Sequence, residues 1–179
     1  MNIIVYGDEN DSTISGILLN ALAKYGGVQI FSAKSLVCNP KNCKPKFFIY
    51  DTNKLPATTN IDGIFLFKKS FKSIDVSEIP KSFFYILDSE NAKAIKFLRK
   101  IEHIVLTYGV DSKSTLTFSS LTSTSAIVNL QRYVKTKNKI LEPQEFPVRL
   151  STQLEPELVL LICAILLFSE IPSLGGYEI

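Results

Sequence analysis

The sequence predicts an α/β fold: a mostly parallel sheet flanked by helices, with a C-terminal antiparallel ribbon and a closing helix. The first 110 residues contain short apolar runs without alternation, which are typical of parallel strands covered on both faces. After Tyr108 apolar and polar residues partly alternate, as in antiparallel strands with one face in water. We therefore predict one domain over residues 1–179, with an α/β core at 1–110 and the ribbon and helix at 111–179.

Short apolar segments in the first part are predicted to be strands, because they are β-branched or aromatic and are bounded by turn residues. They are residues 2–6, 28–31, 47–50, 63–67, 83–87 and 103–107. The connections at 32–46 and 51–62 contain proline, asparagine and lysine, and they are predicted to be loops.

Two helices are expected among these strands. Residues 14–25 place apolar side chains at helical spacing along one face. Asp11 or Ser12 can cap the start by accepting a hydrogen bond from a free backbone N–H, and the glycine pair at 26–27 can end the helix. Asp88 is the predicted cap of a second helix, which runs to Lys100.

The second part predicts the ribbon and the last helix. Residues 116–121, 126–134 and 140–150 are rich in β-forming residues, and the polar stretch 135–139 is a predicted turn between the second and third strands. Residues 154–168 are predicted to form the closing helix.

Composition excludes several classes of partner. The net charge is only +3, and no basic stripe interleaved with aromatic residues is present, so we expect no nucleic-acid partner. The longest apolar run, residues 158–168, has eleven residues, whereas a membrane helix needs about 20. We therefore expect no membrane association. The three cysteines and the lack of a basic, apolar leader favour free thiols and a cytoplasmic protein.

Neither a metal site nor a catalytic residue is predicted. Cys38 and Cys43 have no second pair of ligands, and His103, the only histidine, lies in an apolar stretch. The hydroxyl-rich stretch 119–125 lacks a Gly-x-Ser-x-Gly elbow. No cofactor is expected.

The first loop has the plan of a phosphate-binding loop. Gly7 follows the first strand, and Ser12 and Thr13 open the first helix. In such loops glycine lets the backbone approach a phosphate, a lysine neutralises its charge and a Ser or Thr hydroxyl holds magnesium.

This loop resembles that of the central domain of the Mur ligases, which reads Gly-Thr-Asn-Gly-Lys-Thr/Ser-Thr. Gly7, Ser12 and Thr13 agree with that motif, whereas Asn10 and Asp11 replace its second glycine and its lysine. The resemblance implies a fold related to the phosphate-loop NTPases and a link to cell-wall synthesis.

Two later segments also resemble the family. Residues 88–91 follow a strand as the family's Asn-x-Asp-Asp does, and Tyr108-Gly109 matches its Tyr/Phe-Gly turn. The His-Asn signature that begins the family's last helix is replaced by residues 154–158, and the resemblance does not extend to the family's substrate-binding and C-terminal ligase domains.

The altered loop predicts that phosphate is not held there. Asp8, Glu9 and Asp11 surround the helix start, and like charges at ~4 Å cost about 1 kcal/mol each in bulk water. We interpret these acids as caps, and the loop positions 7 and 10–13 as a vestigial phosphate site.

The leading hypothesis is a non-catalytic binding or scaffold protein with a protein partner, linked to cell-wall metabolism through the resemblance alone. One alternative is a nucleotide-binding or ATP-dependent ligase-type enzyme with an altered loop. A further alternative is a switch domain that holds magnesium through Asp8, Glu9 and Asp11.

Overall fold

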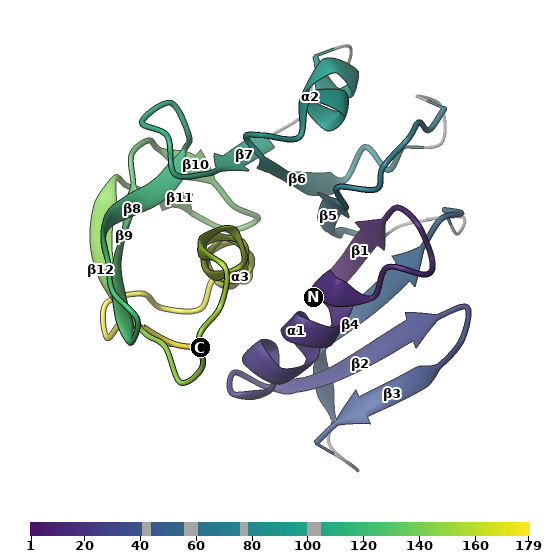
Figure 1. Ribbon diagram of the computed structural model, residues 1–179, viewed down its shortest axis with the longest axis horizontal. Helices are drawn as coiled ribbons and strands as arrows, with labels where there is room; N and C mark the ends of the chain where they lie inside the picture. The colour runs from purple at the N-terminus through teal and green to yellow at the C-terminus, as the bar shows by residue number, and fades with distance from the viewer. Residues whose placement is uncertain (41–43, 56–60, 76–78, 100–104) are drawn as a thin grey trace. The chain divides into compact units, whose positions relative to one another are not determined.

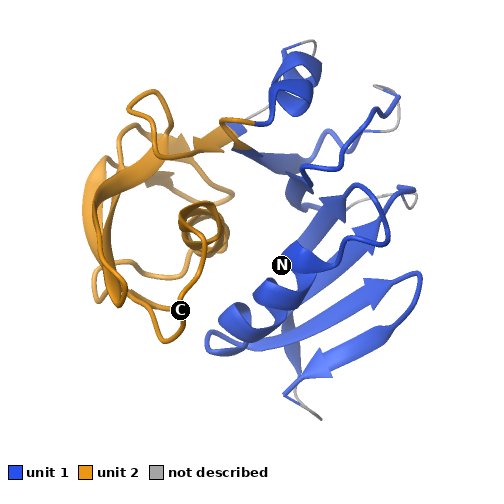
Figure 2. Cartoon of the chain, viewed as in Figure 1, with its two compact units in different colours: residues 1–87, 91–105 blue, residues 88–90, 106–179 orange. Residues whose placement is uncertain are grey.

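The computed structural model describes the chain except for residues 41–43, 56–60, 76–78 and 100–104. It forms two compact units, which Figure 2 distinguishes by colour. Unit 1 comprises Met1–Leu87 and Asn91–Val105, and unit 2 comprises Asp88–Glu90 and Leu106–Ile179. The predicted boundary between the α/β core and the ribbon, at residues 110 and 111, lies close to the start of the main part of unit 2 at Leu106. The assignment of both parts to one domain stays a prediction.

Unit 1 is built on a mostly parallel sheet with the strand order β3-β2-β4-β1-β5-β6 (Figure 1). All neighbours run parallel except β3, which pairs antiparallel with β2 at the edge. As predicted, β1 is an interior strand, between β4 and β5. The strands are β1 (Asn2–Tyr6), β2 (Gly27–Ser32), β3 (Leu36–Asn39), β4 (Pro45–Thr52), β5 (Gly63–Phe67) and β6 (Phe83–Asp88).

Strand β3 corrects the prediction of a loop over residues 32–46. Its sequence, Leu-Val-Cys-Asn, has no strong strand pattern, and Leu36 is 66% exposed. An edge strand needs only one hydrogen-bonded neighbour, which here is β2. Residues 36–39 therefore form a strand because they pair with β2, although they are not a buried apolar run.

Helix α1 (Thr13–Ala23) packs on unit 1's sheet through the buried side chains of Ser15, Leu18, Ala21 and Leu22. It ends before the predicted Tyr25. Gly26, at φ +152°, then makes the turn into β2.

Helix α2 (Ala92–Leu98) is capped differently from the prediction. The Asn91 side chain accepts a hydrogen bond from the N–H of Ala94 at 3.1 Å, whereas Asp88 ends β6 and accepts from the N–H of Glu90. A capping side chain accepts from an N–H two or three residues further along the chain. Asn91 has this spacing to Ala94, whereas Asp88 lies too far before the helix to accept from its first N–H groups. The predicted end at Lys100 lies outside the described residues.

Aromatic side chains form the core beneath one face of unit 1's sheet. Phe65 lies 5.3 Å from Tyr85 and 4.9 Å from Phe67 between ring centroids, and Phe71 packs edge-on against Phe67 at 4.8 Å. The same core cluster includes Ile4 and Tyr6 of β1, so it packs β1, β5 and β6 against one another.

Unit 2 wraps strands around one buried helix, α3 (Pro156–Phe168), as Figure 1 shows. Every residue of α3 from Val159 to Phe168 is buried. The ribbon is antiparallel, as predicted, and a two-residue strand at the C-terminal end runs parallel to β12. The strands are β7 (Val105–Tyr108), β8 (Leu116–Leu121), β9 (Ser125–Leu130), β10 (Val134–Lys135), β11 (Ile140–Leu141), β12 (Gln144–Arg149) and β13 (Tyr177–Glu178).

The ribbon strands are more divided than predicted. Residues 126–134 split into β9 and β10, and residues 140–150 into β11 and β12. The separated ends, β10 and β11, pair with each other as a small second sheet around the predicted turn. Of the predicted strand 103–107, residues 103–104 lie outside the described residues.

The predicted fold class is confirmed: a mostly parallel sheet flanked by helices, with added antiparallel strands. Within the described ranges, no helix is long and apolar enough to cross a membrane.

Glu170 fixes the end of α3 to the β10–β11 turn. Its carboxylate accepts hydrogen bonds from the hydroxyl of Thr136 at 2.7 Å, and from the N–H and the side-chain amide of Asn138 at 2.8 and 2.9 Å. These bonds, with the Asn138 side chain first, hold the pKa of Glu170 below its ordinary value.

A depressed pKa means that Glu170 stabilises the fold above its unfolded pKa, and that this contribution is lost as the pH falls through the lower folded value. Glu170→Gln should therefore destabilise the protein most at neutral pH, and the difference from the parent should shrink in acid. Urea unfolding at pH 7 and below pH 4 measures this, with the exposed Glu142→Gln as the matched control. A difference that stays constant with pH contradicts the role of the Glu170 carboxylate.

Candidate functional site

The topology of unit 1 places a candidate site at the loop between β1 and α1. After β1 the chain continues to β2, which lies on the β4 side of β1 in the strand order. After β5 it continues to β6, which lies in the opposite direction along the sheet. Open α/β sheets bind ligands at the carboxyl ends of strands where the chain direction switches in this way. The β1–α1 loop and the end of β5 meet at that point.

The acidic loop is folded on its own hydrogen bonds. The carboxylate of Asp8 accepts from the backbone N–H of Asn10 at 2.9 Å, and the carbonyl of Asp8 accepts from the N–H of Asp11 at 3.1 Å. The bond from the Asn10 N–H lowers the pKa of Asp8, so this exposed carboxylate carries its charge at neutral pH. The amide oxygen of Asn10 in turn accepts from the ammonium of Lys34 at 2.6 Å.

The start of α1 is capped by Asp11. Its Oδ1 accepts from the N–H of Thr13 at 3.2 Å, and its Oδ2 accepts from the Ser70 hydroxyl at 3.4 Å. Ser12 occupies the N-cap position but makes no side-chain bond to the helix. Of the two predicted caps, Asp11 therefore satisfies a free N–H and Ser12 does not.

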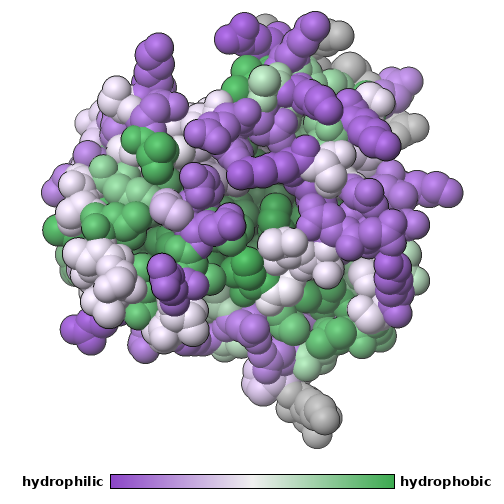
Figure 3. Space-filling view, viewed as in Figure 1, coloured by the Kyte–Doolittle hydropathy of each residue, from purple (hydrophilic) through white to green (hydrophobic). Residues whose placement is uncertain are grey.

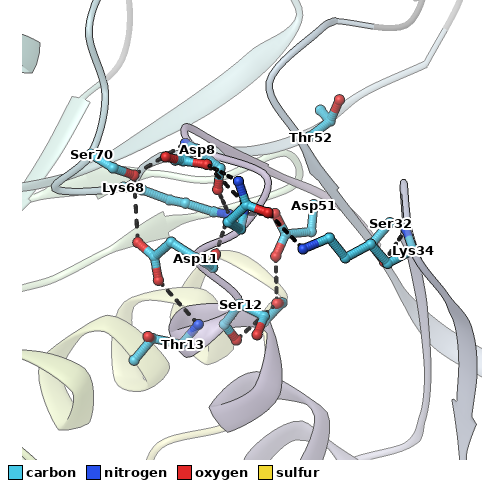
Figure 4. Close-up of polar contacts among 12 residues, drawn as sticks. Asp8, Asp11, Ser12, Thr13, Ser32, Lys34, Asp51, Thr52, Lys68 and Ser70 are labelled. Carbon is cyan, nitrogen blue, oxygen red and sulfur yellow. Dashed lines mark hydrogen bonds and ion pairs between the residues drawn. The ribbon is translucent and has the colours of Figure 1, made fainter.

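A lysine that the sequence analysis did not single out occupies the interior of this loop. Lys68 follows β5 directly, and its ammonium donates to the carbonyl of Asp8 at 2.8 Å, to the carbonyl of Asp11 and to Oδ1 of Asp51 at 2.5 Å (Figure 4). Its side chain has no exposed surface. Because an ammonium has three N–H donors, all of its hydrogen-bonding capacity is used inside the protein.

Asp51 completes a buried network at the carboxyl end of β4. Its side chain is 3% exposed, and its second oxygen accepts from the hydroxyl of Ser15 at 2.5 Å. Ser15 lies on the buried face of α1. The network therefore links α1, β4 and β5 through one ion pair and its hydrogen bonds.

Gly7 is required by the same lysine. A Cβ atom at residue 7 would lie 2.7 Å from Cβ of Lys68, too close for any side chain. The glycine that resembles the first glycine of a phosphate-binding loop thus makes room for the stem of Lys68 in this structure.

Two backbone carbonyls of the loop face a cation in this structure. Phosphate-binding loops direct backbone N–H groups at an anion. Here the carbonyl oxygens of Asp8 and Asp11 are directed at a cation. The N–H groups of Asp8 and Asn10 are taken by the side chains of Ser70 and Asp8.

The structure brings the predicted loop residues, Gly7, Asn10, Asp11, Ser12 and Thr13, together at the start of α1. It adds polar residues from elsewhere in unit 1, which are Ser15, Lys34, Asp51, Lys68 and Ser70. For two of these the sequence held a signal, because Asp51 and Lys68 each directly follow a predicted strand, where parallel strands place functional side chains.

A cavity of about 500 Å³ opens beside the loop, lined in part by Asp8, Glu9, Asn10 and Lys72. The side chains of Asp8 and Asp11 are directed to separate N–H groups and do not converge. Throughout the described part of the chain, no three His, Cys, Asp or Glu residues form a group that could hold a metal ion.

The network predicts that Lys68 can be removed only together with its partner. Lys68→Met keeps most of the stem but leaves Asp51 buried without a cation, which should cost about 3–5 kcal/mol of stability. Adding Asp51→Asn should recover part of the loss, because no unpaired charge then remains. Urea unfolding of both variants measures this, with the exposed neighbour Lys69→Met as the control. Equal losses in the single and double variants would show that the ion pair is not what Lys68 contributes.

No family model and no curated protein sequence matches this chain. Its structure is nevertheless similar to those of several ligases. MurF ligase from Thermotoga maritima in complex with ADP aligns at a TM-score of 0.55 with 13% identity, over 98% of this chain and 46% of that one.

Two further ligase structures align over a similar extent. A UDP-N-acetylmuramoyl-L-alanyl-D-glutamate–2,6-diaminopimelate ligase gives a TM-score of 0.55 with 14% identity, over 94% of this chain and 42% of that one. The UDP-N-acetylmuramoylalanyl-D-glutamyl-2,6-diaminopimelate–D-alanyl-D-alanyl ligase from Acinetobacter baumannii gives 0.52 with 11% identity, over 95% and 43%. The chain spans less than half the length of each of these proteins, and it has the Mur-ligase-like fold that the resemblance of its first loop and two later segments indicated.

Proposed function

We propose that this chain is a non-catalytic Mur-ligase-like domain, which neither binds nor hydrolyses ATP and acts as a binding or scaffold protein. One observation carries the proposal. The carbonyls of Asp8 and Asp11, at the two ends of the acidic loop, both accept from the buried ammonium of Lys68, which is also paired with Asp51.

Lys68 does not substitute for the missing lysine of the loop. To reach a phosphate it would have to leave Asp51, whose carboxylate is buried and paired at 2.5 Å. Breaking a buried pair in this way costs about 3–5 kcal/mol, because it leaves an uncompensated charge. Asp8, Glu9 and Asp11 would add repulsion to each phosphate group.

A binding role agrees with the surface. In the view of Figure 3, hydrophobic residues reach the surface between hydrophilic ones. Exposed side chains such as Leu36, Tyr133, Ile140 and Leu174 offer the apolar contacts that a protein partner uses. We infer from the fold relation that such a partner belongs to cell-wall metabolism, and we place the protein in the cytoplasm.

Calorimetric titration of the parent protein with MgATP tests the proposal. We expect no saturable heat at millimolar nucleotide and no release of phosphate. Micromolar affinity, or an ATPase activity that is lost in Ser12→Ala, would instead favour a nucleotide-binding enzyme with an altered loop. Saturable binding of Mg²⁺ alone would favour a magnesium-dependent switch.

Substitutions of Asp11 separate a cap from a vestigial phosphate site. Asp11→Ala should cost about 0.5–2 kcal/mol of stability, because Thr13 loses the acceptor for its N–H. Asp11→Lys should cost more, since it places a second cation beside Lys68 at the positive end of α1.

A vestigial site predicts the reverse for Asp11→Lys, namely stabilisation by MgATP. Paired urea melts of the two variants, with and without nucleotide, decide between these outcomes. An Asp11→Ala variant that melts like the parent would show that the cap contributes nothing.

A further inference from the structure

Three oxygen atoms surround the ammonium of Lys68 and form what we call the cation cradle: the backbone oxygens of Asp8 and Asp11 and Oδ1 of Asp51. The ammonium lies 2.8 Å from the Asp8 oxygen and 2.5 Å from Asp51 Oδ1, and it also donates to Asp11. The side chain of Lys68 is fully buried. The cradle therefore already holds one cation, which donates N–H groups and is shielded from water.

The cradle is held in place by bonds that do not involve Lys68. The N–H of Asp11 donates to the Asp8 carbonyl at 3.1 Å. The Ser70 hydroxyl accepts from the N–H of Asp8 at 3.1 Å and donates to Asp11 Oδ2 at 3.4 Å. Ser15 donates to the second oxygen of Asp51 at 2.5 Å. We expect these bonds to keep the cradle oxygens near their positions when the lysine is shortened, with the vacated space open to another cation.

The stem of Lys68 occupies a close-fitting channel that leads to the cradle. At residue 7 the backbone approaches this stem so closely that a Cβ atom there would meet Lys68 Cβ at 2.7 Å and its Cγ and Cδ at 3.0 Å. Alanine at position 68 keeps the first carbon of lysine's four-carbon stem. The space that it vacates has the length of n-propylammonium.

We propose that the cradle is a binding site for a primary ammonium ion, which Lys68 fills in the native chain and which a free n-alkylammonium fills in Lys68→Ala. The inference rests on the proposed function, because it assigns to this loop a cation in place of the anion that related loops hold. An anion has no N–H to offer the three oxygens, and the Asp51 carboxylate repels it.

Chemical rescue tests this site. The urea midpoint of Lys68→Ala is followed by circular dichroism during titration with n-propylammonium chloride. We expect the midpoint to rise, to saturate and to recover most of what the substitution lost, whereas the parent stays unchanged. Tetramethylammonium chloride at equal ionic strength is the matched salt control, since it has the charge but no N–H donor. Lys68→Met is the matched protein control, because its side chain still fills the channel.

The proposal is wrong if n-propylammonium stabilises Lys68→Ala no more than tetramethylammonium does, or if Lys68→Met responds equally. Where Lys68→Ala does not fold in buffer, the folded fraction regained on refolding in each salt gives the same comparison. ATP binding is measured on the parent protein, so a failed rescue and a failed proposal on ATP are separate results.

Discussion

The buried ion pair between Lys68 and Asp51 is the interaction on which the candidate site depends. It joins the carboxyl ends of β4 and β5, and through the other N–H groups of Lys68 it holds the loop that follows β1. Ser15 extends the network into α1. Burial of both charges is tolerated because every donor of the ammonium has an acceptor and both oxygens of Asp51 are occupied. The charges therefore specify one geometry at this edge of the sheet.

This network explains how an acidic loop remains stable at the start of a helix. Asp11 caps the start of α1, and the Asp8 carboxylate accepts from Asn10 within the loop. Their carbonyls would still repel one another at the same point without a cation between them, and Lys68 supplies that cation. At the switch point between β1 and β5, where open α/β sheets place ligands, the loop of this chain is thus bound to one of its own side chains.

The likeness to the Mur ligases extends to the fold, and the loop after β1 turns the carbonyls of Asp8 and Asp11 toward an ammonium. A fold supports many activities, so function follows from the site rather than from the architecture. In this chain the carbonyls, the buried carboxylate and the glycine at position 7 are all arranged around an ammonium. The same strand–loop–helix plan can therefore hold either sign of charge, depending on which backbone groups turn inward.

The sequence by itself determined the elements whose signal is local. Apolar runs located β1 and β5, helical spacing located α1, and the residues at positions 10 and 11 are the basis for predicting a loop unsuited to phosphate. Only the tertiary structure decided that Lys68 fills the loop, since 57 to 60 residues separate it from Asp11 and Asp8 and the contact requires β5 to lie beside β1. The edge strand β3 was likewise decided by pairing. Periodicity records which face of an element is buried, whereas strand order decides which distant side chains meet.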